Sequence, residues 1–168
     1  MKEEQQSPTR LGLMVGAIAA VVAVMLGVIG FIPLCGCLAG PLSWATPAGA
    51  GLVAGGLAAS RANWTDAEPG RETSHGVGVA ARAGAVAGAV TAAAFLLVAL
   101  LSPIVAVARN LAIAGLDQDV GAVIITSLVA SAIGLLISFV VAIGSAVAGV
   151  GLAAAAGAIL ASSASKGT

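Results

Sequence analysis

Apolar residues in this chain form very long runs that contain no ionisable side chain. Three such windows cover residues 11–60, 83–108 and 120–165. A charged side chain at the centre of a bilayer costs about 2.5–3.5 kcal/mol on insertion scales. A helix needs about 20 apolar residues to cross the hydrocarbon core. The pattern therefore predicts an all-α, polytopic transmembrane helical bundle, with two spans in the first window, one in the second and one or two in the third.

The predicted transmembrane domain covers residues 11–163, between short tails at residues 1–10 and 164–168. A polar stretch at residues 63–76 is expected to be a loop, because it gathers charged and turn-forming residues. Three prolines are expected to make a loop or broken turn between the first two spans, because proline lacks a backbone donor and disfavours helix before it. They are Pro33, Pro41 and Pro47. The predicted spans are residues 11–32, 44–62, 81–101 and 120–143.

Two parts of this assignment stay open. Residues 104–114 follow Pro103 and form either a short interfacial helix or a kinked continuation of the third span. The apolar run after residue 143 continues to about residue 161. It is either a helical extension of the fourth span or a fifth span. Four spans are favoured because no polar turn residue separates the two halves.

Residues typical of a membrane interface flank the expected spans. Trp44 and Trp64 bracket the second span, about 30 Å apart along a helix, and tryptophan favours the headgroup region. Arg82 can extend its side chain from the start of the third span towards water. With four spans, every basic residue except Arg109 falls on the side of the termini. The positive-inside rule then predicts cytoplasmic termini.

The composition excludes several classes of function. Hydrophobic residues make up 60% of the chain and charged residues 8%, the formal net charge is zero, and tyrosine is absent. Charged residues are too few for a water-soluble surface, because soluble domains typically contain about 25% of them. No basic patch is large enough to bind nucleic acid. The overall character is that of small, glycine-rich, multi-span bacterial membrane proteins, and the expected environment is a lipid bilayer.

Small residues recur at intervals of four, which places them on one face of a helix. Such faces let helix backbones approach closely in a membrane, where dispersion contact replaces the hydrophobic drive. They are expected to pack this chain's own helices, or to bind another copy or another membrane subunit. The candidate packing residues are Gly51 and Gly55; Gly76, Ala80, Gly84, Gly88 and Ala92; Ala130, Gly134, Ser138 and Ala142; and Ser145, Gly149, Ala153, Gly157 and Ala161.

Candidate chemistry is sparse. All acidic residues fall in tails or loops, which disfavours an ion-coupled carrier. Cys35 and Cys37 are interpreted as small residues at a membrane turn, or as a disulfide. His75 is expected to be solvated. No constellation of catalytic roles can be assembled, so we expect neither enzyme activity nor a cofactor or metal.

The predicted function is that of a structural, accessory or assembly subunit in the membrane, as a homo-oligomer or with other membrane subunits. The alternative is an oligomeric pore or small-solute channel, in which Ser127, Ser131 and Ser138 offer hydroxyl groups.

Overall fold

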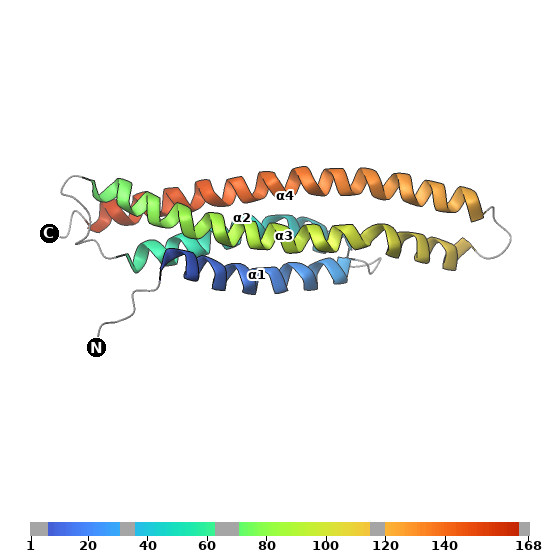
Figure 1. The fold of residues 1–168 in the computed structure, drawn as a ribbon, viewed down its shortest axis with the longest axis horizontal. Helices are drawn as coiled ribbons and strands as arrows, with labels where there is room; N and C mark the ends of the chain where they lie inside the picture. Colours follow the sequence, from blue (N-terminus) through green and yellow to red (C-terminus); the bar gives the residue numbers. More distant parts are fainter. Residues whose placement is uncertain (1–6, 31–35, 63–70, 115–119, 165–168) are drawn as a thin grey trace.

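Four helices account for almost all of the chain that the computed structural model describes, which is residues 7–30, 36–62, 71–114 and 120–164. They are α1 (Pro8–Gly30), α2 (Gly36–Ser60), α3 (Glu72–Ala114) and α4 (Val120–Ala164). Among these residues there is no strand, and the prediction of an all-helical protein is confirmed. The helices lie side by side in an elongated bundle (Figure 1).

The bundle has a thick part and a thin part. α3 and α4 contain 43 and 45 residues and form a long antiparallel hairpin, each about 65 Å long at about 1.5 Å per residue. α1 and α2 contain 23 and 25 residues, about 35 Å each. They lie beside the part of the hairpin that contains the start of α3 and the end of α4 (Figure 1). Among the described residues, the remaining part of the hairpin consists of α3 and α4 alone.

The contacts between glycines and neighbouring helices fix the register. Gly12, Gly16 and Gly27 lie against Ala83, Ala87 and Val98 in the same order, so α1 runs parallel to α3. Gly51 and Gly55 lie against Gly149 and Ala153, so α2 runs parallel to α4. Continued along each pair, this register places Arg10 beside Ala81, Gly30 beside Leu101, and Gly36 beside Gly134.

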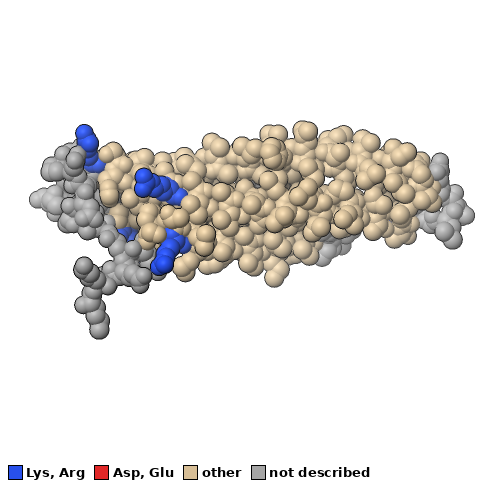
Figure 2. Space-filling view, in the orientation of Figure 1, with Lys and Arg blue, Asp and Glu red and all other residues tan. Residues whose placement is uncertain are grey.

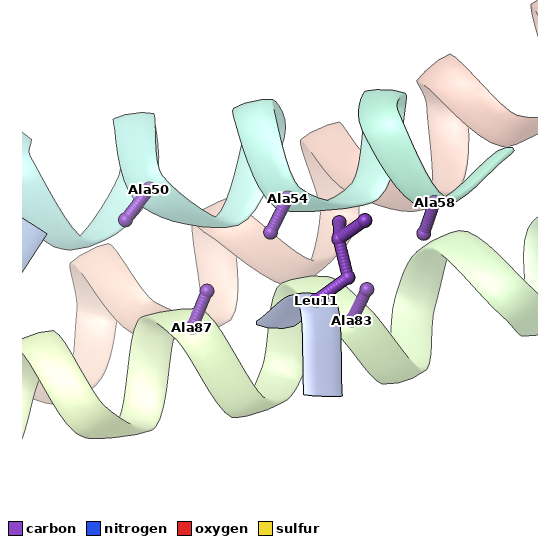
Figure 3. Close-up of a cluster of buried hydrophobic side chains, with 6 residues drawn as sticks. All are labelled: Leu11, Ala50, Ala54, Ala58, Ala83 and Ala87. Carbon is purple, nitrogen blue, oxygen red and sulfur yellow. The ribbon is translucent and has the colours of Figure 1, made fainter. Parts of the chain in front are cut away.

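The interior of the bundle is made of small side chains. Apart from Leu11 and Phe95, every buried hydrophobic residue in the described part of the chain is alanine, and the largest fully buried side chains are those of Thr91 and Pro47. One cluster joins Leu11 of α1 to the alanines of two other helices (Figure 3). These are Ala50, Ala54 and Ala58 of α2 and Ala83 and Ala87 of α3.

The large apolar side chains lie on the outside instead. Ile18, Met25, Leu97, Leu136 and Ile159 are each more than 60% exposed. In water this distribution would be costly, because burial of apolar surface is the main force that stabilises a soluble fold. Surrounded by lipid, the same side chains are in an apolar solvent, and the alanine interior allows close helix packing.

Three helices are long and apolar enough to cross a membrane, over Pro8–Ile29 of α1, Thr73–Ile113 of α3 and Val120–Ser163 of α4. This indicates a multi-pass membrane protein. The expected count of about four spans is not established, because α2 is not among these helices. α2 has sufficient length, but much of its sequence is glycine, alanine and proline rather than larger apolar residues.

The helices are longer than the expected spans. α2 begins at Gly36, so Pro41 and Pro47 lie within it rather than in a loop. Pro41 lies in the second turn of this helix, where it removes one backbone hydrogen bond, and Pro47 is buried against α4. α3 begins at Glu72, within the stretch expected to be a loop.

Both open alternatives resolve to continuous helix. Residues 104–114 continue α3 through Pro103, and α4 runs unbroken to Ala164 without the turn that a fifth span would need. α4 has no proline or polar turn residue in this stretch, whereas in α3 packing along the partner helix stabilises the helix through the local break signal of Pro103.

Substitution of the packed glycine Gly51 by alanine is expected to destabilise the bundle. A Cβ atom at this position would lie 2.8 Å from the carbonyl carbon of Gly149, and overpacking of this kind costs about 1–3 kcal/mol. The matched control is Gly144→Ala in α4, where no heavy atom lies within 4 Å of the added Cβ. This control gains helix propensity and is expected to be neutral or stabilising by up to about 1 kcal/mol. Unfolding in mixed detergent micelles, followed by circular dichroism, measures both. Equal stability of the two variants would contradict the packing described here.

Candidate functional site

The small-residue faces of α2, α3 and the second half of α4 meet one another. A Cβ at Gly84 would lie 2.5 Å from the Ala153 Cβ, and one at Gly157 would lie 2.5 Å from the Gly76 carbonyl oxygen. Gly55 meets Ala153 as well as the carbonyl oxygen of Ala80. These faces are therefore in contact within a single chain.

The remaining members of these faces lie in the same seams. Gly88 faces Ala146 of α4 and the Pro47 carbonyl of α2 at ordinary contact distances, and Gly149 packs against Pro47 and Ala48. Ala92 is buried in a second cluster with Phe95 and Ala142. The seam between α2, α3 and α4 thus follows the expected spacing by four along its length.

The candidate face in the first half of α4 is different. Ala130 and Gly134 are exposed, Ser138 is half-buried and only Ala142 is fully covered. A Cβ added at Gly134 would meet no heavy atom within 4 Å. This face therefore loses its cover where α2 begins, because the register of α2 on α4 places Gly36 beside Gly134.

Basic side chains gather at one end of the molecule. Figure 2 shows arginine side chains near the end of the bundle where α1 begins, and a broad uncharged surface beyond them. Four arginines lie towards this end: Arg10, Arg61, Arg71 and Arg82. The first three are at or next to helix ends there, and the register of α1 on α3 places Arg82 near Arg10. Beyond Arg82, α3 has no charge until Arg109, which lies near its far end.

The far third of the α3–α4 hairpin, here called the distal hairpin, comprises residues 102–114 and 120–134. It holds a pocket of about 320 Å³ between the two helices. Val105, Ala106 and Ala130 provide apolar walls. The other side chains in its lining are polar: Ser102, Arg109, Asn110, Ser127 and Ser131. Gly134 also lines the pocket. Since α2 covers the same seam only up to about Gly134, the pocket is the open continuation of the groove that α2 fills.

A hydrogen-bond chain fixes one wall of this pocket. The Asn110 side-chain amide donates to the Ser127 hydroxyl over 2.8 Å, and that hydroxyl donates to the Val123 carbonyl oxygen over 2.7 Å. The serine proton is committed to the carbonyl, so its oxygen must accept from Asn110, which orients the amide. Asn110 thereby ties α3 to α4 and leaves its own carbonyl oxygen available.

Arg109 is exposed, and no hydrogen bond or ion pair joins it to another residue in the described ranges. A guanidinium has five donors and suits bidentate contacts with phosphate or carboxylate oxygens. With the Ser102 and Ser131 hydroxyls in the same lining, the pocket offers a cation and neutral donors to an anion. Sequence reasoning treated Arg109 only as a topological marker. The sequence does not show that Arg109 and Asn110 of α3 lie opposite Ser127 and Ser131 of α4, because this placement depends on the register of the hairpin.

The other candidate residues do not form a site with the pocket. Cys35 and Trp64 lie outside the described residues, as do the side chains of Cys37 and Trp44. His75 is half-buried in the first turns of α3, at the end opposite the pocket. Within the described ranges no group of His, Cys, Asp and Glu side chains is arranged to hold a metal ion.

Comparisons with protein-family models, with curated proteins and with solved structures gave no match.

Proposed function

We propose that this chain is a structural or accessory subunit of the membrane, without catalytic activity, and that it assembles with a second copy or another membrane protein through its distal hairpin. The observation that carries this proposal is the apolar surface of that hairpin, which extends well beyond the part of the bundle that α1 and α2 cover.

The length of the bundle supports this assignment. The stretch of α3 from Arg82 to Leu101 is about 29 Å long at about 1.5 Å per residue, and a hydrocarbon core is about 30 Å thick. The register of α1 on α3 places Arg10 and Gly30 at the two ends of this stretch. A single bilayer therefore accounts for the four-helix part of the molecule, with the arginines at one surface.

The distal hairpin continues about 20 Å further, from Leu101 to Ala114. Its surface is strongly apolar, since Ile104, Ile113 and Ile125 are 68%, 72% and 64% exposed. Tilting by 20°, a common value for spanning helices, lengthens the path through the core by only about 2 Å. An apolar surface of this extent beyond the core is typical of an interaction site.

Internal packing leaves the distal hairpin as the available surface. The glycine faces of α2 and α3 and of the second half of α4 are occupied within the chain, whereas Ala130 and Gly134 of α4 are open. We therefore assign the contacts with other subunits to the hairpin rather than to the glycine faces of the thick part.

We further propose that α2 accompanies the other helices across the bilayer, with the termini on the cytoplasmic side. α2 packs on α1, α3 and α4, so a four-span arrangement keeps all of these helix contacts within the hydrocarbon core of one bilayer. The positive-inside rule assigns the end with Arg10, Arg61, Arg71 and Arg82 to the cytoplasm.

An oligomeric pore has less support. Its expected hydroxyl groups came from Ser127, Ser131 and Ser138, but Ser127 and Ser131 are buried in the seam between α3 and α4. The Ser127 hydroxyl is already committed to Val123 and Asn110. A pore would have to be lined by other side chains, from several copies.

Removing apolar contacts from the distal hairpin is expected to weaken assembly. The variant Ile104→Ala/Ile125→Ala deletes two of its most exposed side chains, and central apolar contacts typically cost more than about 1 kcal/mol each when truncated at an interface. Chemical cross-linking and native electrophoresis in mild detergent should show that the oligomeric fraction falls at least about tenfold.

The matched control for this experiment is Ile18→Ala/Ile159→Ala, in which two similarly exposed isoleucines of α1 and α4 are truncated outside the distal hairpin. The control should assemble like the unmodified chain. A protein that is monomeric without substitution, and purifies with no partner, would rule the assembly role out.

The orientation can be measured with single cysteines in a Cys35→Ser/Cys37→Ser background. Ala112 lies in the distal hairpin and Ser163 at the opposite end, and both are exposed. A membrane-impermeant thiol reagent applied to intact cells should label Ala112→Cys and leave Ser163→Cys unlabelled until the cells are permeabilised. The reverse pattern would place the termini outside.

A further inference from the structure

We propose that the pocket of the distal hairpin binds the phosphate group of an anionic phospholipid, with Arg109 as the main contact. The proposal rests on membrane insertion of this chain, but not on its assembly with other subunits. The proposed role in assembly does not use the polar residues of this pocket, and the present proposal assigns them a ligand.

The first argument is the chemistry of the lining. Arg109 supplies a permanent positive charge, while Ser102 and Ser131 supply hydroxyl groups in the same lining. Among the residues that the structure describes, no acidic side chain lines the pocket, so the polar part of this lining favours an anion. A guanidinium matches the oxygens of a phosphate in two parallel hydrogen bonds, and basic pockets between membrane helices are typical sites for anionic headgroups.

The second argument is the preformed shape. The pocket is an open groove of about 320 Å³, a volume in the lower range for small-ligand sites and large enough for a headgroup. The Asn110–Ser127 hydrogen bond ties its two helices together. Because this wall is already ordered, little conformational entropy is lost when a ligand enters.

The third argument is the position of Arg109 along the membrane normal. Arg82 and Arg109 are about 40 Å apart on α3 at about 1.5 Å per residue. A bilayer with its headgroup regions is about 40–45 Å thick. With Arg82 and Leu101 at the two boundaries of the hydrocarbon core, Arg109 lies about 12 Å further along α3, and its long side chain can extend back towards the opposite headgroups.

The surroundings favour a lipid over a soluble anion. Val105, Ala106 and Ala130 form apolar walls of the pocket, and the exposed side chain of Ile104 belongs to the stretch of α3 between Arg109 and the hydrocarbon core. A phospholipid can place its phosphate on Arg109 and its acyl chains along this apolar surface. A free phosphate ion would gain only the polar part of these contacts.

The test is native mass spectrometry of the full chain in a neutral detergent, titrated with phosphatidylglycerol or with phosphatidylcholine of the same acyl chains. The unmodified protein should retain one phosphatidylglycerol in preference to phosphatidylcholine. Arg109→Gln should weaken this binding at least about tenfold, equivalent to the loss of about 1.4 kcal/mol. Ser131→Ala keeps the charge and should weaken it less.

The matched control is Arg82→Gln, which removes the same charge from an exposed position on the same helix, outside the pocket. It should leave the preferred lipid bound. Circular dichroism and gel filtration of each variant check that the fold is kept.

Three results would overturn the proposal. The first is equal retention of the two lipids by the unmodified protein. The second is an equal loss of binding in Arg82→Gln and Arg109→Gln, which would indicate a general charge effect. The third is displacement of the lipid by millimolar inorganic phosphate, which would make the pocket a site for a soluble anion. Because lipid binding is measured on the monomer, failure here leaves the assembly role intact, and failure of assembly leaves this site intact.

Discussion

The whole structure depends on one constraint, which is that the medium around the helices must be at least as apolar as their interior. The described core is alanine with a few larger residues, while most large aliphatic side chains point outwards. Hydrophobic burial cannot stabilise such a molecule, because folding in water would leave its most apolar groups exposed. In lipid the balance changes, since dispersion contact between closely packed backbones is then the main attraction between helices.

The positions of glycine follow from this constraint. Gly51, Gly84 and Gly157 occur where α2, α3 and α4 approach closely, and a methyl group there would overlap atoms of the next helix. A Cβ added at Gly144 or Gly151 of α4 would meet no heavy atom within 4 Å. Glycine content alone therefore does not identify the packing faces; its placement relative to the neighbouring helix does.

The same constraint explains the contrast between the two ends of the hairpin. In the thick part, α2 covers the seam between α3 and α4, and α1 packs on α2 and α3. Thr91 is fully buried there, and its hydroxyl donates to its own helix at Ala87. Beyond the start of α2 the seam opens. Arg109, Asn110, Ser127 and Ser131 occur there, where polar groups are reachable from the headgroup region. Assembly and lipid recognition are thus both assigned to the part of the molecule that its own helices leave uncovered.

Much of the fold could be predicted from the sequence. The charge-free windows gave the helical class, and the spacing by four indicated faces that meet in the structure, as at Gly84 and Ala153. Helix ends were harder to predict, because Pro41, Pro47 and Pro103 signal breaks locally while contacts with other helices stabilise the continuous helix. The pocket could not be predicted, since it depends on which residues of α3 and α4 lie opposite each other. That register is set by packing over the whole length of the hairpin.

The central claim, that lipid surrounds the uncharged part of the bundle, is tested most directly by spin labels on the exposed face of α4. Nitroxides at Val140, Ile143 and Val147 should collide frequently with oxygen and rarely with a water-soluble nickel complex, because these positions lie beside the stretch of α3 between Arg82 and Leu101. A label at Ser163 should show the opposite preference. Strong collision with the nickel complex at all four positions in reconstituted vesicles would show that water surrounds these helices, and would contradict the account.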